Sequence, residues 1–108
     1  MENTTVKDGK TMAIISYLWW IGLLIAFIMN SSKRNSFASF HIRQMFGLII
    51  LQFFIGLISR YLSWTVGGIL GIGLLILWVI GFIGAIQGQE KKVPLLGDQF
   101  QDWFKSIG

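Results

Sequence analysis

Three long runs of apolar residues, separated by short polar segments, dominate the sequence. The first runs from Thr11 to about Met29, and the third from about Trp64 to Ile86. At about 1.5 Å of rise per residue, each could form a helix that crosses the roughly 30 Å hydrocarbon core of a bilayer. The second is fully apolar only from Met45 to Ile58, but it is long enough to span when taken from Ser36 to Arg60. We therefore predict an all-α integral membrane protein, a single membrane domain over residues 1–108 with three transmembrane helices at about 11–29, 44–60 and 64–86.

A change in composition after Gln89 marks a C-terminal tail. Pro94 ends any helix that continues from the third apolar run, because proline lacks the backbone N–H. Beyond it, aromatic side chains recur at helical spacing opposite Asp98 and Asp102. This pattern predicts a short amphipathic helix within residues 95–107 that lies on the membrane surface or folds as a lid over the helix ends. The residues expected to meet that surface are Lys91, Lys92, Phe100, Trp103 and Phe104.

Composition and charge agree with a membrane protein and exclude an ordinary soluble domain. Of the 108 residues, 54% are hydrophobic and 13% are charged, whereas about a quarter are charged in a typical soluble domain. The nine Lys and Arg residues lie mainly beside the apolar runs. That placement is typical of chains that orient against lipid headgroups, rather than of a nucleic-acid-binding face. We therefore expect membrane lipids, and no nucleic acid, among the partners.

The distribution of basic residues also predicts an orientation. With three spans, the first loop and the C-terminal tail share one side, and the N-terminal segment and second loop share the other. Six basic residues then lie on the tail side and three on the opposite side. Because cytoplasmic loops carry the excess of Lys and Arg, we predict a cytoplasmic C-terminus and an external N-terminus. The six are Lys33, Arg34, Arg43, Lys91, Lys92 and Lys105, against Lys7, Lys10 and Arg60.

Glycine is concentrated in the third apolar run. Seven of the 13 glycines lie between Gly67 and Gly88, several of them four residues apart. Small residues at this spacing let membrane helices approach closely. We expect this stripe to pack against the other two helices, and a face for a separate subunit or a homo-oligomer stays an alternative. The predicted packing residues are Gly67, Gly71, Gly81, Gly84 and Gly88.

Polar side chains follow one face of the second predicted helix. His41, Gln44 and Gln52 recur at helical steps, with Arg43 beside them. A buried amide such as Gln52 needs hydrogen-bond partners, because an unsatisfied amide in hydrocarbon costs several kcal/mol. Two readings stay open. In the first, Gln52 bonds to a neighbouring helix, and His41 and Arg43 meet helix-terminal carbonyls, lipid phosphates or the tail carboxylates Asp98 and Asp102. In the second, this face lines a wet groove or contacts a segment of a partner protein.

Catalytic chemistry has little support in the sequence. All five carboxylates lie outside the predicted spans, cysteine is absent, and His41 is the single histidine. A multi-histidine metal site, a thiolate nucleophile and a proton-coupled carboxylate in a span are thereby excluded. We predict a non-enzymatic protein with no catalytic residue, no metal and no cofactor.

Two motifs resemble a known family. The stretch Ser36-Phe37-Ala38-Ser39-Phe40-His41-Ile42-Arg43-Gln44 is similar to the helix entrance of a bacterial membrane-protein family grouped with the Tic-type import component of the chloroplast inner envelope. The glycine-rich run ending Gly84-Ala85-Ile86-Gln87-Gly88, followed by Val93-Pro94-Leu95-Leu96-Gly97, agrees as well. The resemblance covers nearly the whole chain from Met12 onward. It implies a small helical protein of the bacterial inner membrane and, for the plastid relatives, a part in protein translocation.

Three functional hypotheses follow. The first is a non-enzymatic accessory or scaffold subunit of a membrane complex, with protein translocation implied only by the resemblance. The second is a homo-oligomeric pore, either a channel or a holin-like lesion, built from the glycine stripe and the Gln52 face. The third is a protein that binds the lipid surface through Trp103, Phe104 and the flanking lysines.

Overall fold

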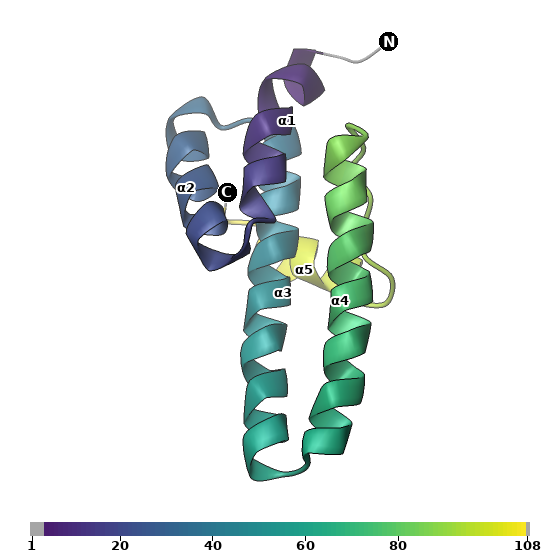
Figure 1. Ribbon diagram of the computed structural model, residues 1–108. Helices are drawn as coiled ribbons and strands as arrows, with labels where there is room; N and C mark the ends of the chain where they lie inside the picture. The colour runs from purple at the N-terminus through teal and green to yellow at the C-terminus, as the bar shows by residue number, and fades with distance from the viewer. Residues whose placement is uncertain (1–3, 108) are drawn as a thin grey trace.

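The computed structural model describes residues 4–107, and these form five helices and no strand. Two long antiparallel helices, α3 and α4, lie side by side, and the remaining helices gather around one half of the pair (Figure 1). We call the end that holds the α2–α3 link the link end, and the end that holds the α3–α4 turn the turn end. The helices are α1 (Thr4–Ser16), α2 (Trp19–Lys33), α3 (Ser36–Tyr61), α4 (Trp64–Ile86) and α5 (Gly97–Trp103).

Helices α3 and α4 correspond to the second and third predicted spans. Their 26 and 23 residues give lengths of about 39 and 34 Å, and both are apolar enough to cross a membrane. In their most apolar stretches, 33% of the residues of α3 and 17% of those of α4 are buried, whereas a core helix of a soluble protein is mostly buried. The exposure is greatest toward the turn end, where Phe53 and Ile69 are each 65% exposed. In lipid, such apolar surfaces carry no free-energy penalty for exposure, whereas in water they do.

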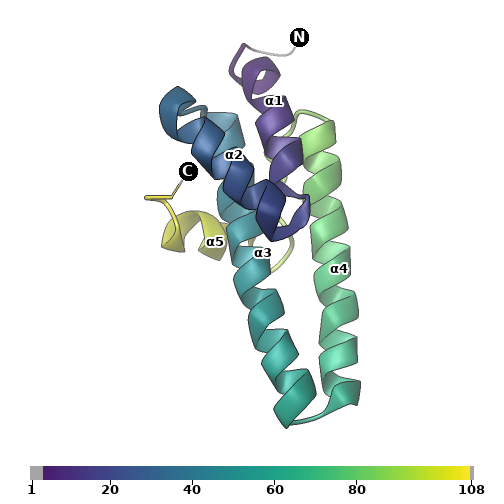
Figure 2. The same cartoon turned by 60° about the vertical axis from the view of Figure 1, so that its left-hand side comes forward.

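The first predicted span is wrong. The apolar run over residues 11–29 does not form one helix, because the chain reverses at Tyr17–Leu18 and divides the run between α1 and α2. These two helices form a hairpin that reaches from the link end to about the middle of α3 (Figures 1 and 2). Within residues 4–107, two helices, not three, are therefore long and apolar enough to span a membrane.

The reversal is stabilised by two tryptophan side chains. The indole Nε1 of Trp78, on α4, donates to the carbonyl oxygen of Tyr17 at 2.9 Å. The indole Nε1 of Trp19 donates to Oε1 of Gln52, on α3, at 3.0 Å. Trp19 itself has a φ of 65°, a left-handed conformation that turns the chain sharply. Hydrogen bonds to Gln52 on α3 and Trp78 on α4 thus stabilise the break between α1 and α2, which the local apolar pattern does not predict.

This arrangement changes the topology of the chain. The start of α1, the α2–α3 link and the end of α4 all lie at the link end of the molecule (Figure 1). The prediction that the two termini lie on opposite sides of the membrane depended on three spans, so it loses its basis with two.

The α2–α3 link is two residues long and is fixed by asparagines. Arg34 ends α2 in the left-handed conformation, with a φ of 48°, and its N–H donates to the carbonyl of Asn30 at 2.7 Å. Asn35 then caps α3, because its Oδ1 accepts from the N–H of Ala38 at 3.0 Å. The Asn30 carboxamide accepts from the Asn35 N–H at 2.8 Å and donates to Ser39 Oγ at 2.8 Å. The link is therefore a defined structure rather than a loose loop.

The hydrophobic core occupies the link-end half of the molecule. There α3 is surrounded by α1, α2, α4 and α5, and Phe37, Ile42 and Leu48 are almost fully buried. The predicted tail helix is present but short, because α5 covers only seven residues. It packs crosswise on α3, with the ring of Phe100 against Gly47.

Replacing Trp78 with Phe tests the hairpin reversal. The phenyl ring retains an aromatic side chain to pack against Phe82, which Trp78 stacks on at 5.0 Å, but it loses the donor to the Tyr17 carbonyl. We expect a loss of about 1 kcal/mol in stability, the usual net value of one hydrogen bond, measured by thermal unfolding in detergent. Trp20→Phe is the control, since Trp20 is 53% exposed. Equal effects of the two substitutions would contradict the assigned role of Trp78.

Candidate functional site

Three buried polar side chains meet where the hairpin tip contacts α3. Tyr17 is 1% exposed, and His41 and Gln44 are fully buried. Gln44 Nε2 donates to the Tyr17 hydroxyl oxygen at 2.9 Å, and that hydroxyl lies 2.7 Å from Nδ1 of His41. Nε2 of His41 lies 2.8 Å from the carbonyl oxygen of Gln89. Because a carbonyl can only accept, His41 is the Nε2–H tautomer and its Nδ1 accepts from Tyr17.

The segment that follows α4 is bound by the same cluster. The Gln44 carboxamide donates from Nε2 to the carbonyl of Lys91 at 3.0 Å, and its Oε1 accepts from the N–H of Val93 at 2.9 Å. This is the pair of bonds that a neighbouring β-strand would make with an extended chain. Gln44 therefore uses both amide hydrogens and its oxygen inside the protein. We call Tyr17, His41 and Gln44 the polar cluster, and residues 89–93 the strap.

Glycines on α4 allow these close approaches. A Cβ atom at Gly81 would lie 2.8 Å from the Tyr17 hydroxyl and 2.9 Å from Gln44 Nε2, and one at Gly84 would lie 2.7 Å from Cβ of Lys91. At the turn end, Gly67 lies against Ser59 of α3. Gly88 has a different place, since it follows α4 with a φ of 73° and turns the chain into the strap. Gly71 faces open space.

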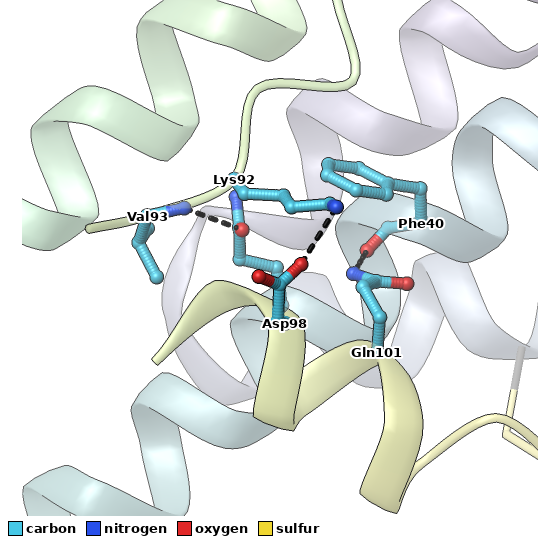
Figure 3. A network of polar contacts seen from close by, with 6 residues as sticks. Phe40, Lys92, Val93, Asp98 and Gln101 are labelled. Carbon is cyan, nitrogen blue, oxygen red and sulfur yellow. Dashed lines mark hydrogen bonds and ion pairs between the residues drawn. The ribbon is translucent and has the colours of Figure 1, made fainter. Parts of the chain in front are cut away.

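Arg43 binds the C-terminal tail through backbone carbonyls. Its Nε donates to the carbonyl of Ile107 at 2.8 Å and its Nη2 to that of Lys105 at 3.0 Å. Beside it, Gln101 Nε2 donates to the carbonyl of Phe40 at 2.8 Å, and Lys92 pairs with Asp98 at 2.6 Å (Figure 3). The hydrogen bonds between the tail and α3 therefore run from side-chain donors to backbone acceptors.

The residues expected at the membrane surface divide into two groups. Lys91, Lys92 and Trp103 are exposed, and Trp103 is 64% exposed. Phe100 is buried, and Phe104 packs edge-to-face on Phe46 at 4.9 Å. The buried aromatic residues attach the tail to α3, which leaves Trp103 and the two lysines as the outward-facing members.

Gln52 lies apart from the polar cluster, in a groove. The groove has a volume of about 450 Å³ and runs from the hairpin tip toward the turn end, between α3 and α4. Its walls are mainly apolar, and the lining residues with polar side-chain atoms are Tyr17, Trp19, Gln52 and Trp78. Gln52 is exposed in it, with Oε1 occupied by Trp19. The other lining residues include Leu48, Ile49, Gly71, Leu74 and Leu75.

Sequence reasoning missed the residues that complete these contacts. Tyr17 and Trp78 lie inside apolar runs and carry no pattern that sets them apart, and Asn30 and Asn35 look like ordinary loop residues. One signal was present: Trp19 lies in the middle of an apolar run, away from the interfacial belt where Trp is usually found. Within residues 4–107 no group of three potential metal ligands comes together.

Comparison with known proteins supports the membrane assignment. The chain is 26% identical over 104 residues to UPF0132 membrane protein MJ1527 of Methanocaldococcus jannaschii, an alignment that covers 93% of this chain and 73% of that protein. It is 28% identical over 95 residues to UPF0132 membrane protein MJ1443 of the same archaeon, with 84% of each chain covered. The chain is a membrane protein. No family model matches it, and no solved structure gives a significant match.

These names carry no function with them. They say that both relatives are membrane proteins, which agrees with the two candidate spans. The likeness to the chloroplast import component is not addressed by either relative, so it stays a prediction from the sequence.

Replacing Tyr17 with Phe tests the polar cluster. The substitution keeps the ring but removes the hydroxyl, and it leaves a buried acceptor on His41 and a buried donor on Gln44 without partners. We expect a loss of about 1–3 kcal/mol in stability and faster proteolysis of the C-terminal tail, because the strap depends on the same side chains. Tyr61→Phe is the matched control, since Tyr61 is 73% exposed. An unchanged unfolding temperature for Tyr17→Phe would contradict a structural role.

Proposed function

We propose that this chain is a non-enzymatic subunit of a membrane assembly, and that the groove between α3 and α4 receives a transmembrane helix of another protein. The observation that carries the proposal is an unused pair of hydrogen-bond donors. Gln52 Nε2 has two hydrogens, and within residues 4–107 neither has an acceptor. Because the Trp19 indole can only donate, Oε1 must face it and Nε2 must face the groove.

The depth of Gln52 gives this observation its weight. Gln52 lies in the middle half of α3, well inside the span, where water is scarce. An amide donor without a partner in hydrocarbon costs several kcal/mol. A backbone carbonyl or polar side chain on an incoming helix would satisfy it, and such interhelical hydrogen bonds contribute about 0.6–2 kcal/mol in membranes.

The shape of the groove fits a helix. In the link-end half, α1 packs against both α3 and α4, and it ends at the hairpin tip. Between the hairpin tip and the turn end, no helix of residues 4–107 packs on the same face of the α3–α4 pair, and the groove lies there. Gly71 lies in this stretch with nothing within 4 Å of a Cβ position, so a second backbone could approach closely. An incoming helix would continue the path that α1 leaves.

Site-specific photo-crosslinking tests this docking. A photoreactive amino acid at Leu75, which lines the groove, is expected to crosslink to one partner protein in cells. The same amino acid at Ile76 is the control, since the two positions are 59% and 55% exposed but Ile76 lies outside the groove. The crosslink should be lost in Gly71→Leu, which fills the groove, and kept in Gly73→Leu, which also points to open space but does not line it.

The crosslinking outcomes separate the functional hypotheses. Crosslinking only to lipid, or equally from positions 75 and 76, would contradict a subunit role. A crosslink to a second copy of the chain would replace it with the homo-oligomeric alternative, for which conductance across liposomes is the next measurement. The resemblance to an import component adds the expectation that the partner belongs to a protein-translocation assembly, and identification of the crosslinked protein tests that directly.

We further propose that the link end faces the cytoplasm. Eight of the nine Lys and Arg residues belong to segments in the link-end half, and Arg60 alone belongs to the turn end. Cytoplasmic segments carry the excess of basic residues. Both termini would then be cytoplasmic, and the two-residue α3–α4 turn would be external.

Cysteine labelling tests this orientation, and the chain has no native cysteine to interfere. Leu62 lies in the α3–α4 turn and is 80% exposed, so a cysteine introduced there as Leu62→Cys would be accessible. We expect a membrane-impermeant maleimide to label it in intact cells. Lys33→Cys, at the exposed end of α2, should react only after the membrane is opened. Labelling in the reverse order would contradict the proposed orientation.

A further inference from the structure

A second hollow lies on the other side of α2, and its lining changes from polar to apolar along its length. At the link end it is lined by two arginines, four serines and Phe27, with a volume of about 430 Å³. Toward the middle of the molecule it adjoins an apolar groove of about 340 Å³ that also contains Phe27. The polar residues are Arg34, Arg43, Ser31, Ser36, Ser39 and Ser106.

The change in polarity follows all three segments that form the walls. On α2, Trp20, Leu23 and Leu24 line the apolar groove, whereas Ser31 and Arg34, at the end of the helix, line the polar part. On α3 the polar part takes residues 36, 39 and 43, and the apolar groove takes residues 42 and 46. In the tail, Ser106 lies in one part and Ile107 in the other. The whole feature thus has a charged mouth at the link end and an apolar continuation toward the membrane interior.

The charged mouth fits a phosphate group. No carboxylate lines it, and neither Arg34 nor Arg43 forms an ion pair with any residue in the range 4–107. The Arg43 guanidinium is oriented by its two bonds to tail carbonyls, which leaves its remaining N–H groups for a ligand. Ser36 is the first residue of α3, where the helix dipole adds partial positive charge. Arginine forks and hydroxyl groups are common phosphate donors.

The conformation of Arg34 is the second observation. Its φ of 48° places it in the left-handed region, at the helix-ending position where glycine is the usual residue. In this chain a long charged side chain occupies a backbone conformation that glycine prefers. Such strain at a site is a reason to look for a function of the side chain.

From this geometry we infer that the chain binds one anionic phospholipid, with its phosphate between Arg34 and Arg43 and an acyl chain in the groove beside Trp20, Leu24 and Phe27. The occupant is a lipid rather than free phosphate, because the mouth continues into a groove with almost no polar surface. The site lies against α2, α3 and the tail, so it is separate from the groove between α3 and α4.

Lipid titration of the purified full chain tests the site. Dioleoylphosphatidylglycerol is added to the protein in a neutral maltoside detergent, and bound lipid is counted by native mass spectrometry. One molecule of dioleoylphosphatidylglycerol is expected to bind. Dioleoylphosphatidylcholine and inorganic phosphate, titrated in parallel, should bind at least about tenfold more weakly, given the strength of charge-assisted hydrogen bonds. Equal binding of phosphatidylcholine, or of inorganic phosphate, overturns the inference, as does no bound lipid.

Two pairs of variants locate the binding. Arg34→Gly should weaken binding about tenfold or more and leave the unfolding temperature unchanged or raised, because glycine prefers this backbone conformation. Lys33→Gln removes the same charge one residue away, outside the lining, and should change binding little. Leu24→Trp should block the acyl chain, whereas Ile25→Trp, equally on the exposed surface of α2 but outside the groove, should not. Equal losses within either pair overturn the site.

Discussion

The hydrogen bonds that join Tyr17, His41 and Gln44 connect three segments that are distant in the sequence. Tyr17 belongs to the tip of the α1–α2 hairpin, the other two belong to α3, and their outer partners are the carbonyls of residues 89 and 91 and the N–H of residue 93 after α4. Helix α4 packs directly against the cluster at Gly81, where a side chain would collide with Tyr17 and Gln44. Every buried side-chain nitrogen and oxygen in residues 4–107 has a partner. In a low-dielectric interior, a network in which every donor and acceptor is used fixes one arrangement, because any shift leaves a polar atom unpaired.

That constraint determines where the hairpin ends and what it leaves open. Tyr17 contacts His41 and Gln44, about 8 and 12 Å along α3 from its start, and Trp19 contacts Gln52, about 24 Å along it. The reversal between Tyr17 and Trp19 therefore lies near the middle of α3. Helix α2 then starts at Trp19. The indole of Trp78 donates a hydrogen bond to the Tyr17 carbonyl, which is left without a helical partner where α1 ends. The groove below the tip is the direct consequence, since no segment in residues 4–107 covers that part of α3 and α4. Gln52 lies at its edge, with one atom bound to the hairpin and its donors facing outward.

The sequence predicted the elements that local patterns determine. The third apolar run and α4 share the bounds Trp64 and Ile86, and α3 runs from Ser36 to Tyr61 where Ser36 to Arg60 was expected. The first run failed because an uninterrupted apolar stretch has the same pattern as one long helix or as two short ones. What distinguishes them is bonds to residues far along the chain: His41 and Gln44 of the polar cluster, and Trp78, which lies 61 residues after Tyr17. For the same reason the sequence placed His41 and Gln44 on one face of a helix, but it could not supply the strap that they bind.

The glycines illustrate the same limit. Spacing grouped Gly67, Gly71, Gly81, Gly84 and Gly88 in one stripe, yet they meet different surroundings. Three lie against Ser59, the polar cluster and Lys91, one turns the chain after α4, and Gly71 faces open space. Spacing along a helix gives the face on which a residue lies, but not what covers that face. Only the length of α1, which is fixed by the polar cluster, determines that Gly81 is covered and Gly71 is not.

The two sides of the molecule place polar groups at different depths. On the α4 side the surface stays apolar up to Ile86, the last residue of the helix. On the side of α5, charged and polar groups lie at the level of Phe40 and Arg43, about 10 Å along α3 from its start. A bilayer of uniform thickness cannot match both sides, so lipid must adapt where the tail crosses α3. A headgroup held by Arg34 and Arg43 would sit at this step, with its acyl chain covering the apolar surface of α2. In that arrangement the bound lipid resolves the mismatch that the position of the tail creates.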